Sequence, residues 1–216
     1  SVKNLWDRWA SDMTFVCCGR IDASFSARDT AEYLKNSFCN RQTDKYIDNI
    51  LSRKNPDSIK QSLCALNGLV WLLRKAGVRE SGLILERSAN NKPYFANSGV
   101  RFSLSHSEDC FACVISSTEV GIDIETKKVP QDKVELISGR FFKSDEQAFV
   151  SKNTKNFLKV WTAKEAYTKM LDITLARGFA QCDFFGSDNF FLDFEYETAT
   201  VALCTLLRES VNIYAL

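Results

Sequence analysis

The sequence predicts an α+β protein of two similar lobes with pseudo-twofold symmetry, each a small antiparallel sheet packed with a long helix. A long helical pattern followed by several strand patterns occurs twice along the 216 residues. Hydrophobic residues make up 45% of the chain and charged residues 25%, which is the balance of an ordinary globular protein with buried cores. We expect residues 1–119 to form the first lobe and residues 120–216 the second, with the functional site between them.

The first lobe is organised around a long helix predicted from Pro56 to Ala76. Its apolar residues recur at helical spacing, at Ile59, Leu63, Leu66, Val70 and Leu73. Asn55 or Asp57 can cap its first turn, and Gly77 suits the position just beyond its end. Strand patterns follow at 83–86, 101–106 and 111–116, with a turn at 90–93.

The second lobe begins with a strand pattern at Val120–Glu125, after the turn at 117–119. Helical patterns then cover 133–137, 144–150 and 156–171. The last part of the chain returns to strand patterns at 189–196, 200–207 and 211–216. Helices followed by strands in this order favour an α+β fold over a parallel α/β sheet.

Composition and charge exclude several classes of protein. A net charge of +1 gives no overall attraction to nucleic acid, and no basic stripe is evident. The apolar stretches are too short to cross a bilayer, and the first eight residues do not resemble a signal peptide, so we expect a cytoplasmic protein without membrane association. The eight cysteines are then expected to be reduced, and with His106 as the only histidine a structural zinc site is not expected.

The first candidate site lies in the strand Val120–Glu125. Residues two apart on a strand project from the same face, so Asp123 and Glu125 would stand side by side. Neighbouring carboxylates repel each other unless a cation lies between them, and such oxygen ligands favour Mg²⁺ or Ca²⁺. Taken alone, however, an edge strand with two solvated acids explains the pattern better.

The second candidate site lies in the helical stretch Trp161–Lys169, where Glu165 and Lys169 are four residues apart on one face. The simpler explanation is a surface ion pair with Trp161 anchored in the core. If Glu165 instead joins the two strand carboxylates and Lys169 lies beside them, the group could hold a metal-bound pyrophosphate.

A third stretch, Phe102–Ser107, brings hydroxyl groups and His106 to a strand end, where they could donate to a phosphate if the imidazole is protonated. A lone histidine is more often structural. The sequence has no Gly-x-Ser-x-Gly elbow, Walker loop or Gly-x-Gly-x-x-Gly motif, which weighs against serine hydrolases, nucleotide hydrolysis and dinucleotide chemistry by those routes.

In combination, four ordered blocks resemble the 4′-phosphopantetheinyl transferase superfamily, in particular its surfactin-synthetase-activating, monomeric and pseudo-dimeric type. The blocks are Asn91-Lys92-Pro93, Ser103-Leu104-Ser105-His106-Ser107, Gly121-Ile122-Asp123-Ile124-Glu125 and Trp161-x-x-Lys164-Glu165-Ala166-x-x-Lys169. The resemblance implies transfer of phosphopantetheine from coenzyme A to a serine of an apo acyl or peptidyl carrier protein, with release of adenosine 3′,5′-bisphosphate. It also implies a monomer that uses Mg²⁺, with Mn²⁺ as a possible substitute.

The resemblance assigns roles by position. Asp123, Glu125 and Glu165 would hold the metal, and Glu165 would also be the catalytic base. Lys169 would be catalytic, steadying the phosphate under attack. The positions implied to bind coenzyme A are Lys45, Lys60, Lys92, Pro93, Ser105, His106, Lys164 and Lys169.

The chain departs from the family pattern at Asn91, where glycine is usual, although asparagine tolerates left-handed backbone. Lys60 stands where the family usually has an arginine. The alternatives are another Mg²⁺-dependent phosphoryl or nucleotidyl transferase, and a carrier-binding paralogue without activity. The complete set of three carboxylates and Lys169 favours an enzyme.

Overall fold

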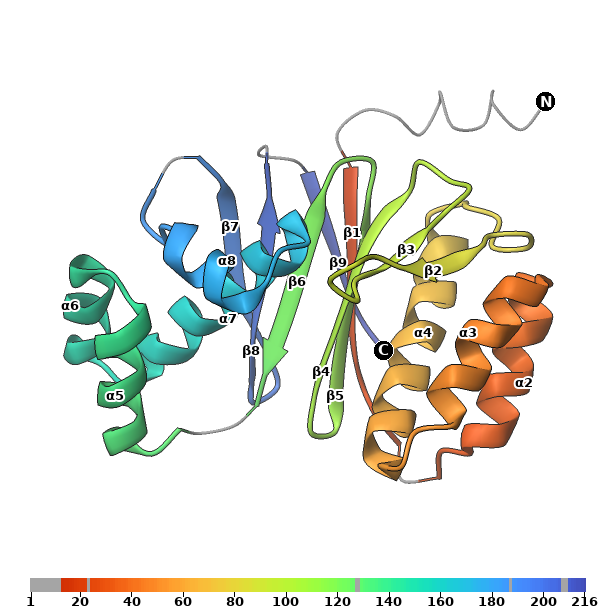
Figure 1. Ribbon diagram of the computed structural model, residues 1–216, viewed down its shortest axis with the longest axis horizontal. Coiled ribbons are helices and arrows are strands. Elements are labelled where there is room, and N and C mark those ends of the chain that lie inside the picture. Colours follow the sequence, from red (N-terminus) through yellow and green to blue (C-terminus); the bar gives the residue numbers. More distant parts are fainter. Residues whose placement is uncertain (1–12, 23, 127–128, 187, 207–209) are drawn as a thin grey trace.

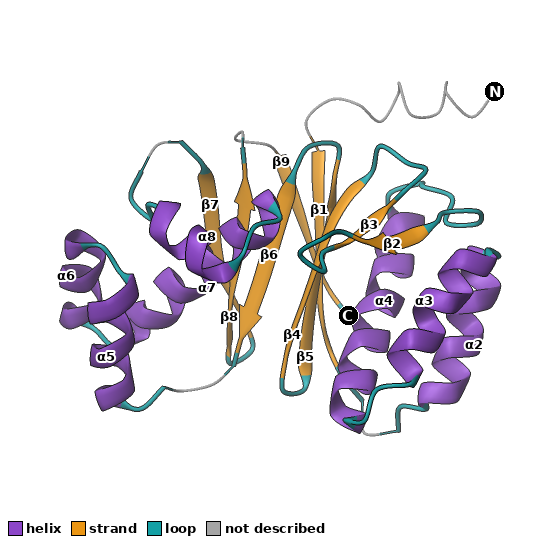
Figure 2. Cartoon of the chain, viewed as in Figure 1, coloured by secondary structure: helices purple, strands orange, loops and turns teal. Residues whose placement is uncertain are grey.

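The computed structural model describes residues 13–22, 24–126, 129–186, 188–206 and 210–216, and it confirms the α+β class (Figures 1 and 2). The elements before the second candidate lobe are β1 (Met13–Arg20), α2 (Ala27–Phe38), α3 (Arg41–Leu51), α4 (Pro56–Lys75), β2 (Leu85–Arg87), β3 (Pro93–Phe95), β4 (Arg101–Ser107) and β5 (Cys110–Ser116). The remaining elements are β6 (Val120–Glu125), α5 (Gln131–Phe141), α6 (Ser144–Lys152), α7 (Lys155–Leu171), α8 (Leu175–Gln181), β7 (Phe190–Tyr196), β8 (Ala199–Thr205) and β9 (Ser210–Ala215).

The long helix α4 forms as the sequence predicts. The Asn55 side chain accepts hydrogen bonds from the backbone N–H groups of Asp57 and Ser58, which satisfies donors that the first turn leaves unpaired. The apolar face of α4 packs against one face of a four-stranded sheet with the order β4-β5-β1-β9. Helices α2 and α3 lie beside α4, so three helices gather on the right of this sheet in Figure 1.

The other half of the molecule contains a three-stranded sheet with the order β6-β8-β7, against which α7 packs. Apolar residues of β1 and β5 on one side and of β6 and β8 on the other form a single buried cluster, so the two sheets share a core. The helices lie on the outer sides (Figure 2). Cys110 belongs to this shared core and Cys113 to the core under α4, so the two thiols face opposite sides of β5.

The last strand, β9, does not follow the lobe boundary that the sequence predicts at residue 120. β9 pairs in parallel with β1, placing Ser210–Ala215 in the sheet of the first half. That sheet is therefore mixed rather than purely antiparallel. The expected strand at 200–207 ends at Thr205 in the structure, and residue 207, like the first eight residues, lies outside the described residues.

All eight cysteines are free thiols, and all except Cys39 are buried. Within the described ranges, no helix combines the length and apolar character needed to cross a membrane. Asn91 has a φ of 67°, so the left-handed turn expected at this departure from the family pattern is confirmed.

Candidate active site

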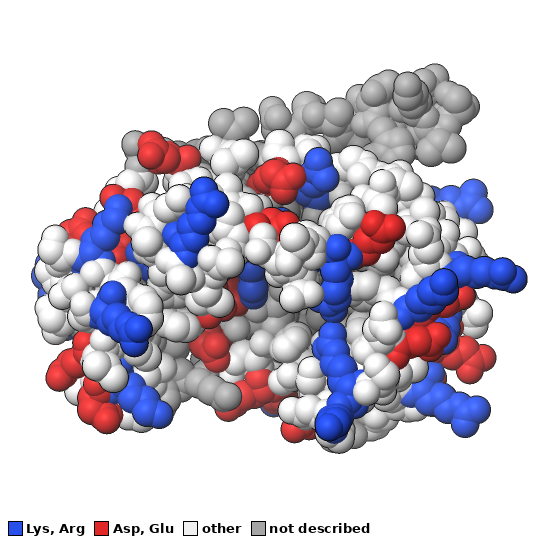
Figure 3. All heavy atoms as spheres, in the orientation of Figure 1, with Lys and Arg blue, Asp and Glu red and all other residues white. Residues whose placement is uncertain are grey.

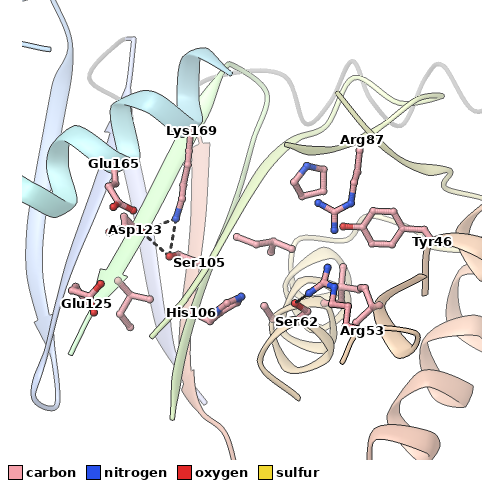
Figure 4. A pocket seen from close by; sticks show the side chains of 16 residues that line it. Tyr46, Arg53, Ser62, Arg87, Ser105, His106, Asp123, Glu125, Glu165 and Lys169 are labelled. Carbon is pink, nitrogen blue, oxygen red and sulfur yellow. Dashed lines mark hydrogen bonds and ion pairs between the residues drawn. The ribbon is translucent and has the colours of Figure 1, made fainter. Parts of the chain in front are cut away.

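A cavity of about 330 Å³ lies where β4 and β6 approach α4 and the hairpin β2–β3. One end is lined by Asp123, Glu125 and Glu165 together with Lys169, and the other end by Arg53 and Arg87. Figure 4 shows the carboxylates on one side of the cavity and the two guanidinium groups on the other. In Figure 3, acidic atoms lie to the left of the central hollow and a column of basic atoms lies to its right.

The acidic end depends on close packing between β6 and α7. A Cβ atom on Gly121 would clash with the backbone oxygen of Ala166 and would lie 2.6 Å from the backbone nitrogen of Met170. Only glycine allows the helix backbone to approach the strand this closely. The approach brings Glu165 and Lys169 of α7 over Asp123 of β6, as the sequence predicts (Figure 4).

Asp123 is held by two hydrogen bonds to one of its oxygens. Its side chain is buried, and Oδ1 accepts from Lys169 Nζ at 2.6 Å and from Ser105 Oγ at 2.7 Å. The second oxygen, Oδ2, is also buried and has no hydrogen-bond partner within the described part of the chain. Buried carboxylate oxygens are normally satisfied, so this carboxylate can accept either a cation or a proton from Glu165, whose carboxyl lies within hydrogen-bond reach of Asp123.

The carboxyl of Glu165 is the most strongly perturbed group of the site. Its pKa is raised to about 7, first by burial and then by the nearby carboxylates of Asp123 and Glu125, whereas Lys169 opposes the rise. Three carboxyl groups with one ammonium leave excess negative charge in a partly buried space. The site therefore favours either a proton on Glu165 or a bound cation.

This pKa predicts how the metal-free protein responds to pH. Because the folded-state pKa is about 7 and the ordinary value is 4.5, the folded protein keeps the proton where the unfolded chain loses it. The free energy of unfolding should therefore fall as the pH rises from about 5 to 8, by about 1–3 kcal/mol for this group.

Chemical denaturation in EDTA measures this change. Glu165→Gln cannot ionise, so the pH dependence of its stability should be flatter than that of the wild type by this amount. Equal pH profiles for the two proteins would contradict the proposed charge balance.

The donor set fits a hard divalent cation. Oxygen ligands from carboxylates suit Mg²⁺, which also keeps several waters, and Asp123 Oδ2 offers a buried acceptor without a partner. Among the described residues, however, no group of three or more His, Cys, Asp or Glu side chains is already arranged to hold a metal ion. The Lys169 ammonium instead pairs with Asp123 Oδ1 at 2.6 Å.

The opposite end of the cavity is cationic. Arg53 donates from Nη1 to Ser62 Oγ at 2.7 Å and to Ser58 Oγ at 3.1 Å. Arg87 lies over the ring of Tyr46, with 4.9 Å between the guanidinium carbon and the ring centroid. Burial lowers the pKa of Arg53, and Arg87 lowers it further. In the described part of the chain neither guanidinium pairs with a carboxylate, so together they form a site for an anion.

His106 lines the cavity between its two ends (Figure 4). Although the His106 side chain is exposed to the cavity, desolvation by the cavity walls lowers the pKa of its imidazole, and the positive charges of Lys169 and Arg53 also lower it. The histidine is therefore neutral at neutral pH in the free protein. A bound phosphate would reverse this electrostatic effect, so protonation of His106 would accompany the arrival of an anion rather than precede it.

Of the residues expected to contact coenzyme A, Pro93, Ser105, His106 and Lys169 line the cavity. Lys45 is exposed on α3 and is not among the lining residues. Lys60 is also outside the lining, because its ammonium lies 5.9 Å from the ring centroid of Phe25.

Lys92 and Lys164 take positions that the sequence does not predict. The Lys92 ammonium donates to the backbone oxygens of Val120 and Met170, so it links the hairpin β2–β3 to the other half of the molecule instead of lining the cavity. Lys164 is wholly buried and forms an ion pair of 2.9 Å with Glu146, which is equally buried. Because Lys164 is wholly buried and does not line the cavity, it cannot contact coenzyme A there as the family resemblance implies.

Sequence reasoning missed Tyr46, Arg53 and Arg87. Arg53 offered one usable signal, because it lies just before the cap of α4 and helix N-termini attract phosphate groups. Tyr46 and Arg87 come together only through the packing of α3 against β2, and no motif marks them in the sequence.

Comparison with known proteins points to one family for part of the chain. The sequence model described as "4'-phosphopantetheinyl transferase superfamily" matches residues 119–206. The chain is 26% identical to the 4′-phosphopantetheinyl transferase gsp of Aneurinibacillus migulanus, over 67% of this chain and 57% of that protein. It is 33% identical to the 4′-phosphopantetheinyl transferase HetI of a Nostoc species, over 43% of each chain.

A third relative is the 4′-phosphopantetheinyl transferase psf-1 of Bacillus pumilus, which is 36% identical over 41% of this chain and 39% of its own length. The matches thus span between about two fifths and three fifths of these curated relatives. The likeness to gsp and psf-1 supports the surfactin-synthetase-activating type that the motifs resemble. The superfamily match contains Asp123, Glu125, Glu165 and Lys169, so the part of the chain that carries the acidic end of the cavity is similar to the 4′-phosphopantetheinyl transferase superfamily.

Proposed function

We propose that this protein transfers 4′-phosphopantetheine from coenzyme A to a serine of an apo acyl or peptidyl carrier protein and releases adenosine 3′,5′-bisphosphate. The observation that carries the proposal is the polarity of the cavity. Carboxylates with an unpartnered buried oxygen lie at one end, and two arginines without acidic partners in the described chain lie at the other. A ligand with two separated phosphate groups matches this arrangement, and coenzyme A is such a ligand.

The 3′-phosphate of coenzyme A fits the cationic end. Arg53 and Arg87 would bind its oxygens, His106 would add a donor once protonated, and Pro93 with Tyr46 would offer apolar surface to the base. The pyrophosphate would then lie towards Lys169 and the carboxylates. Asp123, Glu125 and Glu165 would hold Mg²⁺, or Mn²⁺ in its place, and the bound metal would neutralise the phosphate charge and stabilise the departing phosphate.

The residues of this chain then supply base catalysis and positioning. Glu165, with a pKa of about 7, accepts the proton of the carrier serine as the serine oxygen bonds to the phosphorus of the phosphopantetheine phosphate. The bond from that phosphorus to the bridging oxygen breaks, and adenosine 3′,5′-bisphosphate leaves with the bonding electrons. Lys169 donates to the phosphate oxygens as charge develops on them, and its bond to Ser105 keeps the ammonium in place.

Removing one of the two arginines at the cationic end should weaken coenzyme A binding. Arg53→Ala is expected to raise the dissociation constant for coenzyme A about tenfold to a hundredfold, since hydrogen bonds to a charged group contribute about 1.5–3 kcal/mol. Isothermal titration calorimetry with coenzyme A measures this change.

Dephospho-coenzyme A, which lacks the 3′-phosphate, provides the control ligand. It should bind wild type and Arg53→Ala with nearly equal affinity. If both ligands lose the same affinity in the variant, Arg53 supports the cavity wall and does not bind the 3′-phosphate.

The carrier would dock next to the acidic end, on the surface that includes 133–150. Leu136 and Phe141 of α5 are exposed there and provide apolar contact area. Lys143 forms an ion pair of 2.9 Å with Asp183, so it is already partnered in the free protein. We further propose a cytoplasmic monomer that binds neither nucleic acid nor membrane.

Two alternative functions would differ from this proposal in what the protein requires or does. A different phosphoryl or nucleotidyl transferase would use the same carboxylates but would not require coenzyme A. A binding-only paralogue would bind the carrier without modifying it. The raised pKa of Glu165 beside Lys169 favours an enzyme over both a structural role and simple binding.

A further inference from the structure

Three serines of β4 lie at the boundary between the two sheets. Ser103, Ser105 and Ser107 alternate along the strand, so their side chains share one face, and all three are buried. That face meets β6. In the described chain, β4 and β6 are edge strands of two separate sheets and do not pair with each other as strands.

The serine hydroxyl groups of β4 form the hydrogen bonds to β6 along this boundary, where paired strands would have backbone hydrogen bonds. Ser103 Oγ accepts from the backbone N–H of Ile122 at 3.2 Å. Ser105 Oγ donates to Asp123 Oδ1 at 2.7 Å, and Ser107 Oγ donates to Glu125 Oε1 at 2.5 Å. The spacing of two in β4 therefore matches the spacing of two between the carboxylates of β6 (Figure 4 shows Ser105 beside Asp123).

Ser107 is held more firmly than an isolated hydroxyl would be. Its oxygen accepts from the backbone N–H of Thr126 at 3.2 Å and lies 3.0 Å from the Thr126 hydroxyl. Because Thr126 holds this oxygen, the Ser107 hydroxyl is oriented to donate its proton to Glu125. One oxygen of each carboxylate is thus bound, and within the described residues the buried Asp123 Oδ2 has no hydrogen-bond partner.

We propose that Ser107 is a positioning residue that holds Glu125 in the orientation needed to bind the divalent cation, while Ser103 on the same strand only joins the two halves of the molecule. The inference rests on the proposed role of Asp123 and Glu125 as metal ligands. Groups that hydrogen-bond to ligating carboxylates orient them, and losing such a group lowers metal affinity about 10–100-fold.

Binding of Mn²⁺ alone tests this assignment, with free Mn²⁺ counted by electron paramagnetic resonance in the absence of coenzyme A and carrier. Ser107→Ala is expected to raise the Mn²⁺ dissociation constant about tenfold. Ser107→Thr keeps the hydroxyl and should restore most of the affinity. Ser103→Ala is the matched control: it should lower the denaturation midpoint while leaving Mn²⁺ affinity unchanged.

Three results would overturn the assignment: wild type that binds no Mn²⁺, Ser107→Ala with wild-type affinity, or Ser103→Ala with the same loss as Ser107→Ala. The last result would show that loosening the boundary between the sheets is enough to weaken the site. Because neither coenzyme A nor carrier is present, these outcomes are independent of whether the protein transfers phosphopantetheine. A failed transfer assay with normal Mn²⁺ binding would instead count against the proposed function alone.

Discussion

Glu165→Gln is expected to lower kcat for carrier modification by about two to four orders of magnitude, the range usual for removing a general base. The amide has nearly the shape of the carboxyl but cannot accept the proton of the attacking serine. It also removes one negative charge from the set proposed to hold the metal. Release of adenosine 3′,5′-bisphosphate under saturating coenzyme A and carrier measures the change.

A matched control separates the loss of the base from general damage. Glu195 is an exposed carboxylate on β7, and Glu195→Gln should leave kcat unchanged. Glu165→Gln should also keep or increase the stability of the metal-free protein at neutral pH, because it removes a carboxyl that the fold holds at a raised pKa. If Glu165→Gln retains more than about a tenth of wild-type kcat, Glu165 is not the base.

Lys164→Met is expected to lower the free energy of unfolding by about 3–5 kcal/mol, because it leaves a buried charge without its partner. Glu146 is wholly buried, and its carboxylate also accepts from the backbone N–H groups of Lys143 and Phe184. The Lys164 ammonium in turn donates to the backbone oxygens of Phe179 and Cys182. The pair therefore ties α6, α7 and the segment after α8 together. Denaturant titration measures the loss.

The double variant Lys164→Met, Glu146→Leu supplies the control for this prediction. Replacing both charges by apolar side chains of similar size should recover part of the lost stability, although the backbone groups that the pair satisfied remain unpaired. A single variant that loses less than about 1 kcal/mol would show that the ion pair is not buried as described. Affinity for coenzyme A should change little in any variant that still folds, because Lys164 does not line the cavity.

Elements with strong local patterns could be predicted from the sequence. The helix α4 begins at Pro56 after the cap at Asn55, and its period of apolar residues matches the buried face that the structure shows. The strand β6 and the helix α7 were predicted together with the candidate site residues that they carry, because Gly121, Asp123 and Glu165 form a motif whose spacing has a physical reason.

The elements before Pro56 and the partner of β9 could not be predicted in this way. The strand β1 is central and buried, and the parallel partner it finds in β9 lies almost 200 residues away, so no local pattern records the pairing. Helices α2 and α3 were missed for a different reason, because local signals do exist: Ser26 and Asn40 cap them, and each buries apolar residues at helical spacing. The short helix α8 gave no periodic signal long enough to recognise.

The same distinction applies to the candidate site. Its acidic end was predictable because two contiguous motifs carry all three carboxylates and Lys169. Its cationic end was not, because Arg53 and Arg87 come from separate elements that meet only in the folded chain. Lys92 and Lys164 were assigned from motif position, whereas burial and hydrogen bonding determine where their ammonium groups lie.

The intact mass of an apo carrier protein, measured after incubation with this protein, coenzyme A and Mg²⁺, tests the central claim most directly. The carrier should gain one phosphopantetheine, about 340 Da, on a single serine. The gain should disappear with EDTA and with Glu165→Gln. Several unrelated apo carriers that remain unmodified, together with no detectable binding of coenzyme A, would contradict the transferase function.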